Sequence, residues 1–300
     1  MSLKRAVAVA ASALLLGGLA AAPAGAAGTS TSATTATTAA CSLWAGSVTA
    51  GGDQASTTIT ATSPITAEKA TAWPKMFAPG VAKIASTWTE TMGISGNTQT
   101  YGEIILNSTL YSGEYGHDDS TGKPFSTVKS QGGGYNGYRA IESSFYGGRT
   151  VRGAWYRLRG DGVLYRTENK VVSRWSGYAS VKTMALISET ATYDTFLATT
   201  FGGQLYTIHI PVAAGKAPIV TKVRTSTWQG FEFLVAEKCG TQGTLLLAVD
   251  KDTKSAYLYA VSHAKGTATV IKGLGKVPGS FSDPVYFLNT AEGNPPLFGE

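Results

Sequence analysis

Two short landmarks alternate along this chain and divide it into repeated units. One is a Leu-aromatic pair, present at Leu43-Trp44, Leu110-Tyr111, Leu164-Tyr165, Leu205-Tyr206 and Leu258-Tyr259. The other is a Gly followed closely by an aromatic or apolar residue, present at Gly80-Val81, Gly137-Tyr138, Gly177-Tyr178, Gly230-Phe231 and Gly279-Ser280-Phe281. From the second landmark to the next first one the chain advances by 30, 27, 28 and 28 residues, whereas the reverse steps vary from 13 to 37 residues. A fixed unit joined by loops of variable length is typical of a repeat fold.

Each fixed unit has the pattern of a strand meander. In the third copy, residues 181–187, 195–200 and 204–208 are apolar or β-branched, and the segments between them carry Gly, Asp, Thr and Ser. The fourth copy repeats this pattern at 231–236, 245–249 and 256–261. Because no stretch carries a helical apolar stripe, the sequence predicts an all-β protein of short strands.

The last unit begins at Phe281 and residues 285–288 but stops before a Leu-aromatic strand. The missing strand is available at Leu43-Trp44. We therefore expect a five-bladed β-propeller of four-stranded antiparallel sheets, in which N- and C-terminal strands close the ring in one blade. Closure places Cys41 beside the fourth unit, which contains Cys239, and predicts a disulfide between them; two free thiols are the alternative.

The N-terminal segment indicates export. Lys4 and Arg5 precede an apolar run and a small-residue cleavage sequence, so residues 1–27 are predicted to be a signal peptide rather than a membrane anchor. Residues 28–40 have the Ser/Thr/Ala composition of a disordered linker. The propeller domain is expected over 41–290, with a C-terminal tail at 291–300, and the product is expected to be secreted and extracellular.

Charge argues against a general nucleic-acid binder, because the formal net charge of +6 is small for a chain of 300 residues. The excess is concentrated in residues 139–174, where eight Lys/Arg face three acids. Such a segment could bind an anionic cell-surface polymer. The alternative is a solvated strand face, which the alternation around Arg157 and Arg159 also predicts.

Residues 228–234, followed by Leu258-Tyr259-Ala260-Val261, resemble the tachylectin-2 family of five-bladed propeller lectins. That family combines a Gly-Trp-x-x-Phe-x-Phe-Leu strand with a Gly-x-Leu-Tyr-x-Val strand. The likeness is clearest over residues 135–290, and around residue 228 the Gly and Trp are reordered. The resemblance implies several weak, equivalent sites for N-acetylated amino sugars, with no metal, no cofactor and no catalysed reaction.

The candidate ligand-binding residues are the aromatics and glycines that recur at equivalent places in the units. An aromatic face suits the apolar face of a sugar ring, and Gly allows close backbone approach. These residues are Tyr138, Trp175, Gly177, Tyr178, Trp228, Gly230 and Phe231. The alternative is that the aromatics are wedges packed between blades.

Recognisable catalytic motifs are missing from the sequence, so an enzyme is not expected. The predicted function is a secreted, monomeric carbohydrate-binding propeller whose partner is a glycan or cell-surface polysaccharide, without membrane insertion. Two alternatives stay open. One is a propeller glycoside hydrolase, which needs a central funnel lined by convergent carboxylates; Asp161, Asp194 and Glu232 are candidates that spacing cannot pair. The other is an adhesion or protein-interaction scaffold.

Overall fold

The computed structural model describes residues 40–92 and 97–300. The predicted signal peptide and all but the last residue of the predicted linker lie outside the described residues. In the described part the regular secondary structure consists of β-strands, which confirms the predicted all-β class. No helix among these residues is long and apolar enough to cross a membrane.

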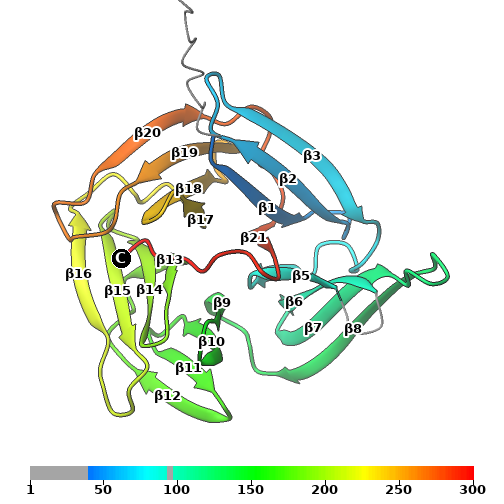
Figure 1. Ribbon diagram of the computed structural model, residues 1–300, viewed down its shortest axis with the longest axis horizontal. Helices are drawn as coiled ribbons and strands as arrows, with labels where there is room; N and C mark the ends of the chain where they lie inside the picture. Colours follow the sequence, from blue (N-terminus) through cyan, green and yellow to red (C-terminus); the bar gives the residue numbers. More distant parts are fainter. Residues whose placement is uncertain (1–39, 93–96) are drawn as a thin grey trace, which may run out of the picture. The chain divides into compact units, whose positions relative to one another are not determined.

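Twelve consecutive strands form three antiparallel sheets of four strands, as the repeat predicts (Figure 1). The second sheet comprises β9 (Tyr138–Gly147), β10 (Val151–Arg159), β11 (Leu164–Glu168) and β12 (Val171–Trp175). The third sheet comprises β13 (Val181–Glu189), β14 (Tyr193–Thr200), β15 (Leu205–Pro211) and β16 (Ile219–Arg224). The fourth sheet comprises β17 (Phe233–Cys239), β18 (Gly243–Asp250), β19 (Ser255–Val261) and β20 (Ile271–Lys276).

The other nine strands form one sheet built from two groups. The first group contains β4 (Ala82–Ala85), β5 (Trp88–Met92), β6 (Thr98–Leu106), β7 (Thr109–His117) and β8 (Pro124–Gly133). The fifth group contains β21 (Val285–Ala291), β1 (Ser42–Val48), β2 (Gln54–Thr60) and β3 (Thr66–Trp73). A short parallel pairing of β21 with β5 joins the groups, which the sequence analysis did not predict. It is possible because the two strands run in the same direction and approach each other at one end.

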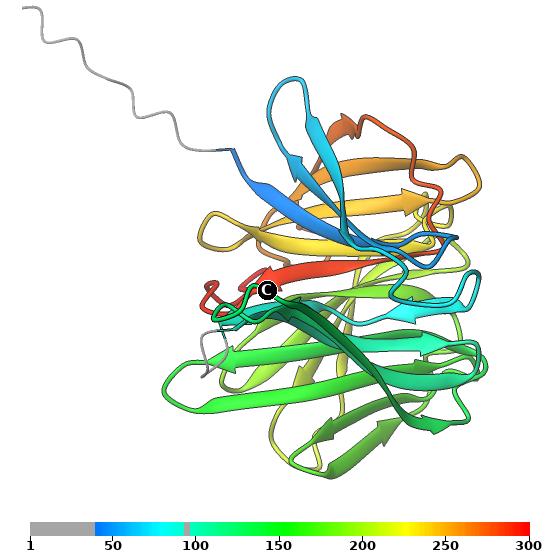
Figure 2. The same ribbon diagram turned by 90° about the vertical axis from the view of Figure 1, so that its right-hand side faces the viewer.

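The fifth group is assembled from distant parts of the chain, as predicted. Residues Ala45 to Val48 of β1 pair antiparallel with Val285 to Leu288 of β21. Figure 2 shows red β21 lying between blue β1 and the cyan strands of the first group. Cys41, just before β1, forms a disulfide with Cys239 at the end of β17, with the two Cα atoms 5.4 Å apart. The predicted disulfide is therefore confirmed.

The last strand of each four-stranded sheet is its most exposed strand. In the third sheet, β13 and β14 are buried almost throughout, because neighbouring sheets cover both of their faces. The last strand, β16, is mostly exposed, with Ile219 and Val220 more than half accessible. The sequences of the inner strands are therefore continuous apolar runs. The sequences of the outer strands show no such pattern, because few of their residues are buried.

Five apolar clusters fill the spaces between neighbouring sheets or groups. Tyr156 of the second sheet packs against Phe196 of the third, and Leu197 of the third sheet shares a cluster with Leu246 of the fourth. A further cluster joins the fourth sheet to the fifth group, and another joins the fifth group to the first around Trp88. The smallest cluster joins the first group to the second sheet. Each sheet or group therefore packs against two others.

The innermost strands contact one another in the same order. Strand β9 contacts β13, β13 contacts β17, β17 contacts β21, β21 contacts β4, and β4 contacts β9. The space they share is lined mostly by apolar residues and leaves a void of only about 30 Å³. A much larger cavity lies at the ends of these strands, and this cavity is the candidate site.

Candidate functional site

The candidate site is a cavity of about 440 Å³ lined by β5, β6, β9, β13, β17 and β21. We call it the inner-strand cavity. Its polar lining includes the carboxylates of Glu189, Glu237 and Glu292. Its aromatic lining consists of Tyr101, Phe145, Tyr146 and Phe298. Phe145 is 57% exposed and Tyr101 is 43% exposed, so these two rings are accessible to a ligand.

The C-terminal segment supplies one wall of this cavity. Residues 291–298 line it after leaving β21, and Figure 1 shows this red segment running from β21 toward β13. The backbone N–H of Glu189 donates to the carbonyl of Leu297 over 3.0 Å, and Gly299 N donates to the carbonyl of Ile187 over 2.8 Å. The segment predicted as a tail is thus hydrogen-bonded to an inner strand.

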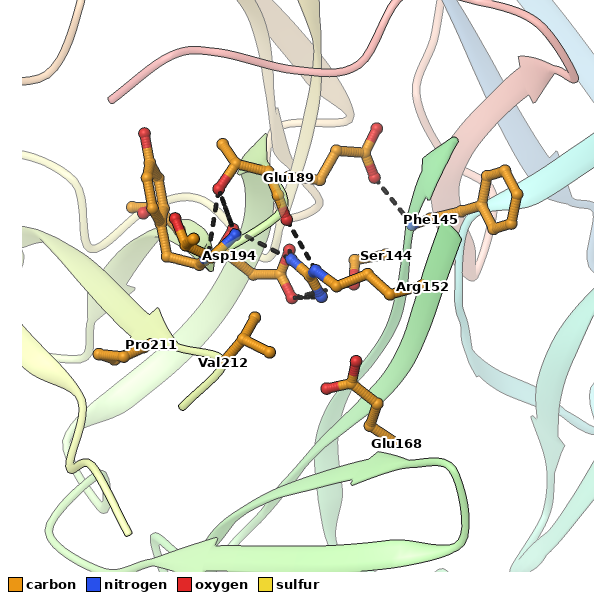
Figure 3. A network of polar contacts seen from close by, with 12 residues as sticks. Ser144, Phe145, Arg152, Glu168, Glu189, Asp194, Pro211 and Val212 are labelled. Carbon is orange, nitrogen blue, oxygen red and sulfur yellow. Dashed lines mark hydrogen bonds and ion pairs between the residues drawn. The ribbon is translucent and has the colours of Figure 1, made fainter. Parts of the chain in front are cut away.

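Glu189 ends β13, where the strand reaches the cavity. Its Oε2 accepts a hydrogen bond from the backbone N–H of Phe145 on β9 over 2.9 Å (Figure 3). Among the described residues, nothing donates to the other carboxylate oxygen. Burial, together with the nearby charge of Asp194, raises the pKa of Glu189 from 4.5 to about 7, against the opposing effect of the hydrogen bonds and of Arg152. The carboxyl is therefore held beside an exposed aromatic ring and titrates near neutral pH.

Two other inner-strand glutamates behave similarly. Glu142 of β9 accepts from the backbone N–H of Thr87 over 2.7 Å and from Ser143 N over 2.9 Å. Glu237 of β17 accepts from Lys238 N over 2.8 Å. Burial raises the pKa of both carboxyls. Glu142 and Glu189 each accept a hydrogen bond from a backbone amide of another strand region, Thr87 and Phe145 respectively.

A buried polar network behind Glu189 connects the second and third sheets (Figure 3). The fully buried carboxylate of Asp194 accepts from Arg152 through both oxygens, at 2.9 and 2.5 Å. It also accepts from Ser144 Oγ at 3.0 Å and from Tyr156 Oη at 2.5 Å. Such a bidentate, fully bonded pair fixes the relative position of β10 and β14. Arg152 Nε also donates to the carbonyl of Thr190, the residue that follows Glu189, over 2.7 Å.

The predicted ligand-binding residues are spread over three sheet boundaries rather than gathered in one site. Trp175, at the end of β12, is half-buried and lines a separate groove of about 370 Å³ with Arg166, Arg174 and Lys216. Gly177 has φ +105 and an open surrounding, which suits its position in a loop. Tyr138 is half-buried, and its ring centre lies 4.9 Å from that of Tyr135.

The remaining predicted aromatics are buried. Tyr178 belongs to the cluster between the second and third sheets, and Trp228 and Phe231 belong to the cluster between the third and fourth. Trp228 packs against Tyr259 with ring centres 5.1 Å apart. Gly230, between these two aromatics in sequence, is exposed. Burial favours the wedge alternative for these three aromatics; ligand contact at the seven positions stays a prediction.

Most arginines of the basic segment 139–174 are used inside the protein. Ion pairs join Arg152 to Asp194, Arg157 to Glu103, Arg159 to Asp161 and Arg166 to Glu168. Arg139 donates to two backbone carbonyls of the adjacent sheet region. This favours a structural role for much of the segment and leaves Arg149, Lys170 and Arg174, the last beside Trp175, as exposed cations.

Sequence reasoning did not select the inner-strand cavity. Its carboxylates follow no motif, and its aromatics come from strands far apart in the chain. One signal was available: Glu142, Glu189 and Glu237 each interrupt or end the apolar run of an innermost strand. A charged residue in a run buried on both faces is unusual enough to mark a functional candidate.

Comparisons with known proteins add no family. No family model matches the chain, and a search of curated proteins found no match. The site must therefore be interpreted from its own geometry.

Proposed function

We propose that residues 41–290 form a five-bladed β-propeller that binds carbohydrate in the inner-strand cavity. Five packed interfaces between successive sheets, and innermost strands that each contact two others, support the closed arrangement. The β1–β21 pairing supports closure by both ends of the domain. The resemblance to tachylectin-2 lectins agrees with this architecture. Of the sites between blades that the resemblance implies, the proposal includes only the groove at Trp175.

The observation that carries the carbohydrate proposal is the composition of the inner-strand cavity. Exposed Phe145 and Tyr101 offer flat apolar faces, and Glu189 and Glu237 offer acceptors for hydroxyl groups. A sugar ring presents both kinds of surface, and a cavity of about 440 Å³ has the size of a small-ligand site. The position of Glu189 is fixed by Phe145 N, so the acceptor and the ring act together.

The setting of this site is extracellular. The Lys/Arg-plus-apolar start of the sequence is that of an exported protein. The disulfide between Cys41 and Cys239 is stable in an oxidising compartment. Polysaccharides of the cell surface or surroundings are then the accessible ligands.

Binding is tested by a glycan array followed by titration calorimetry with the wild type and Phe145→Ala. Removing the exposed ring from the cavity is expected to weaken glycan binding by about tenfold or more, the effect of losing one stacking aromatic. Phe201→Ala is the matched control, because Phe201 is 55% exposed but does not line the cavity. A folded wild-type protein that binds no glycan refutes the proposal.

Glycoside hydrolysis is the second candidate, and one observation favours it. The pKa of Glu189 is raised to about 7, which suits a general acid that must be protonated near neutral pH. Glu237, on the adjacent innermost strand, is a second carboxyl in the same cavity. In this scheme Glu189 protonates the leaving oxygen and Glu237 serves as base or nucleophile.

The two candidates are separated by measuring reducing-end release from the glycan that binds best. A hydrolase loses this activity in Glu189→Gln while retaining much of its binding. A wild-type protein that binds the glycan without releasing reducing ends is a binding protein only.

A further inference from the structure

The inner-strand cavity has an unusual charge for this protein. The chain carries a formal net charge of +6, yet the cavity lining contains Glu189, Glu237 and Glu292. Among the described residues that line it, none is Lys, Arg or His. The lining therefore holds three carboxyl groups and no basic side chain, and the nearby Lys238, which lowers the pKa of Glu237 against the larger effect of burial, lies outside it. Such a lining attracts positive ligands and repels acidic ones.

Aromatic rings form the second half of the lining. Tyr101, Phe145, Tyr146 and Phe298 come from β6, β9 and the C-terminal segment. The face of an aromatic ring carries negative potential and attracts cations, and rings grouped in a cavity are the usual binding site of ammonium groups. The ring of Phe298 already has one such contact, because Lys238 Nζ lies 5.3 Å from its centre. Lys238 itself does not line the cavity.

The carboxylate and the ring are held next to each other. The hydrogen bond from Phe145 N to Glu189 Oε2 places the end of β13 against the backbone of the residue that carries the exposed ring. The charged groups nearest to Glu189 are Asp194 and Arg152, which neutralise each other in a bidentate pair behind it. Glu189 therefore has no cation of its own within the described part, and its free oxygen is available to a positive group.

We propose that the inner-strand cavity recognises an ammonium group, and that the carbohydrate it binds is an amino sugar with a free amine. The second clause rests on the proposed carbohydrate function; the first depends only on the lining. An N-acetylated amine would lose the charge that the carboxylates attract. Glu189, with a pKa of about 7, is ionised in about half of the molecules at neutral pH, and a bound ammonium group favours its ionised form. A neutral sugar would bury carboxylates against hydroxyl groups alone, which compensates their desolvation less well.

The test is titration calorimetry near neutral pH with four probes. Three are β-1,4-linked hexasaccharides that differ at the second carbon of each ring: a glucosamine oligomer, its N-acetylated form, and the glucose oligomer with a hydroxyl there. The fourth is tetramethylammonium chloride, which supplies the charge without a sugar. The glucosamine oligomer is expected to bind at least tenfold more tightly than the other two oligosaccharides.

Variants assign the effect to this cavity. Glu189→Gln keeps the acceptor for Phe145 N but removes the charge, and is expected to reduce the preference for glucosamine about tenfold. Glu68→Gln is the control, because Glu68 is an exposed glutamate of β3 that does not line the cavity. An unchanged preference in Glu189→Gln would assign recognition to another surface and overturn the inference.

The outcomes separate this inference from the proposed function. Equal binding of all three oligosaccharides would support carbohydrate binding and overturn ammonium recognition. Binding of tetramethylammonium with no oligosaccharide would support ammonium recognition and refute the carbohydrate function. Binding of the N-acetylated oligomer alone would overturn the inference and support a lectin of the kind implied by the family resemblance.

Discussion

Glu189→Gln should change how the stability of the protein depends on pH. The folded state raises the pKa of Glu189 from 4.5 to about 7, chiefly through burial. The folded protein therefore binds this proton more tightly than the unfolded chain does. The resulting stabilisation is fully present below pH 4.5 and is lost as the pH rises through 7.

The expected magnitude follows from the two pKa values. A change from 4.5 to about 7 corresponds to about 3 kcal/mol in total. About 2.5 kcal/mol of this falls between pH 5 and pH 8. Glutamine does not titrate, so the variant lacks this contribution. Relative to the wild type, it should gain about 2.5 kcal/mol of stability over that interval.

Urea unfolding at a series of pH values measures this difference directly. Glu142 and Glu237, whose pKa values are also raised by burial, remain in both proteins and cancel in the comparison. Glu68→Gln is the control, because it makes the same substitution at an exposed glutamate outside the cavity. A stability difference between Glu189→Gln and the wild type that does not vary from pH 5 to pH 8 would show that Glu189 titrates normally.

Three further variants test the contacts that hold the sheets together. Arg152→Leu leaves the fully buried Asp194 without its cation and should cost about 3–5 kcal/mol in urea unfolding; a loss below about 1 kcal/mol would contradict the buried network. Removing the disulfide by Cys41→Ser with Cys239→Ser opens a loop of 198 residues and should cost up to about 5 kcal/mol, measured as a lower urea midpoint than that of the oxidised wild type; an unchanged midpoint would contradict it. Trp228→Ala should cost about 3–5 kcal/mol through the cavity it creates, and a neutral thermal melt would show that Trp228 does not pack between sheets.

The strand repeat was predictable because the residues that define it are buried. Leu164, Leu205 and Leu258 of the first landmark are fully buried, so each position requires an apolar residue regardless of the length of the loops. The second landmark marks entry into the innermost strand, where Tyr178 and Phe231 fill the boundary between sheets. Spacing between such positions is set by sheet geometry and survives in the sequence.

The outer strands and the parallel β5–β21 pairing were not predictable in the same way. Strands β12, β16 and β20 are largely exposed, so few of their positions are constrained by burial. The pairing of Asn289 with Trp88 joins residues about 200 positions apart and depends on how two sheets approach each other. No local pattern in the sequence indicates that these two strands approach each other.

Ligand contact at the seven predicted residues stays a prediction, and the inner-strand cavity was not predicted from the sequence. Recurring aromatics such as Trp228 suggested surface sites, but repetition in a strand protein also marks packing between units, and Trp228 is buried. The inner-strand cavity, by contrast, gathers Tyr101, Glu189 and Phe298 from segments with no sequence relation. A site lined by six strands from different sheets and by the C-terminal segment can be recognised only once the positions of the sheets are known.

The split fifth group sets an order on biosynthesis. Strand β1 has no partner on its β21 side until residues 285–291 have been made, by which time the three middle sheets are complete. Pairing of β1 with β21 must then follow the synthesis of residues 285–291, after the strands of the three middle sheets have been made. A circular permutant that joins β21 to β1 brings these paired strands close together in the sequence and should refold faster than the natural order of strands.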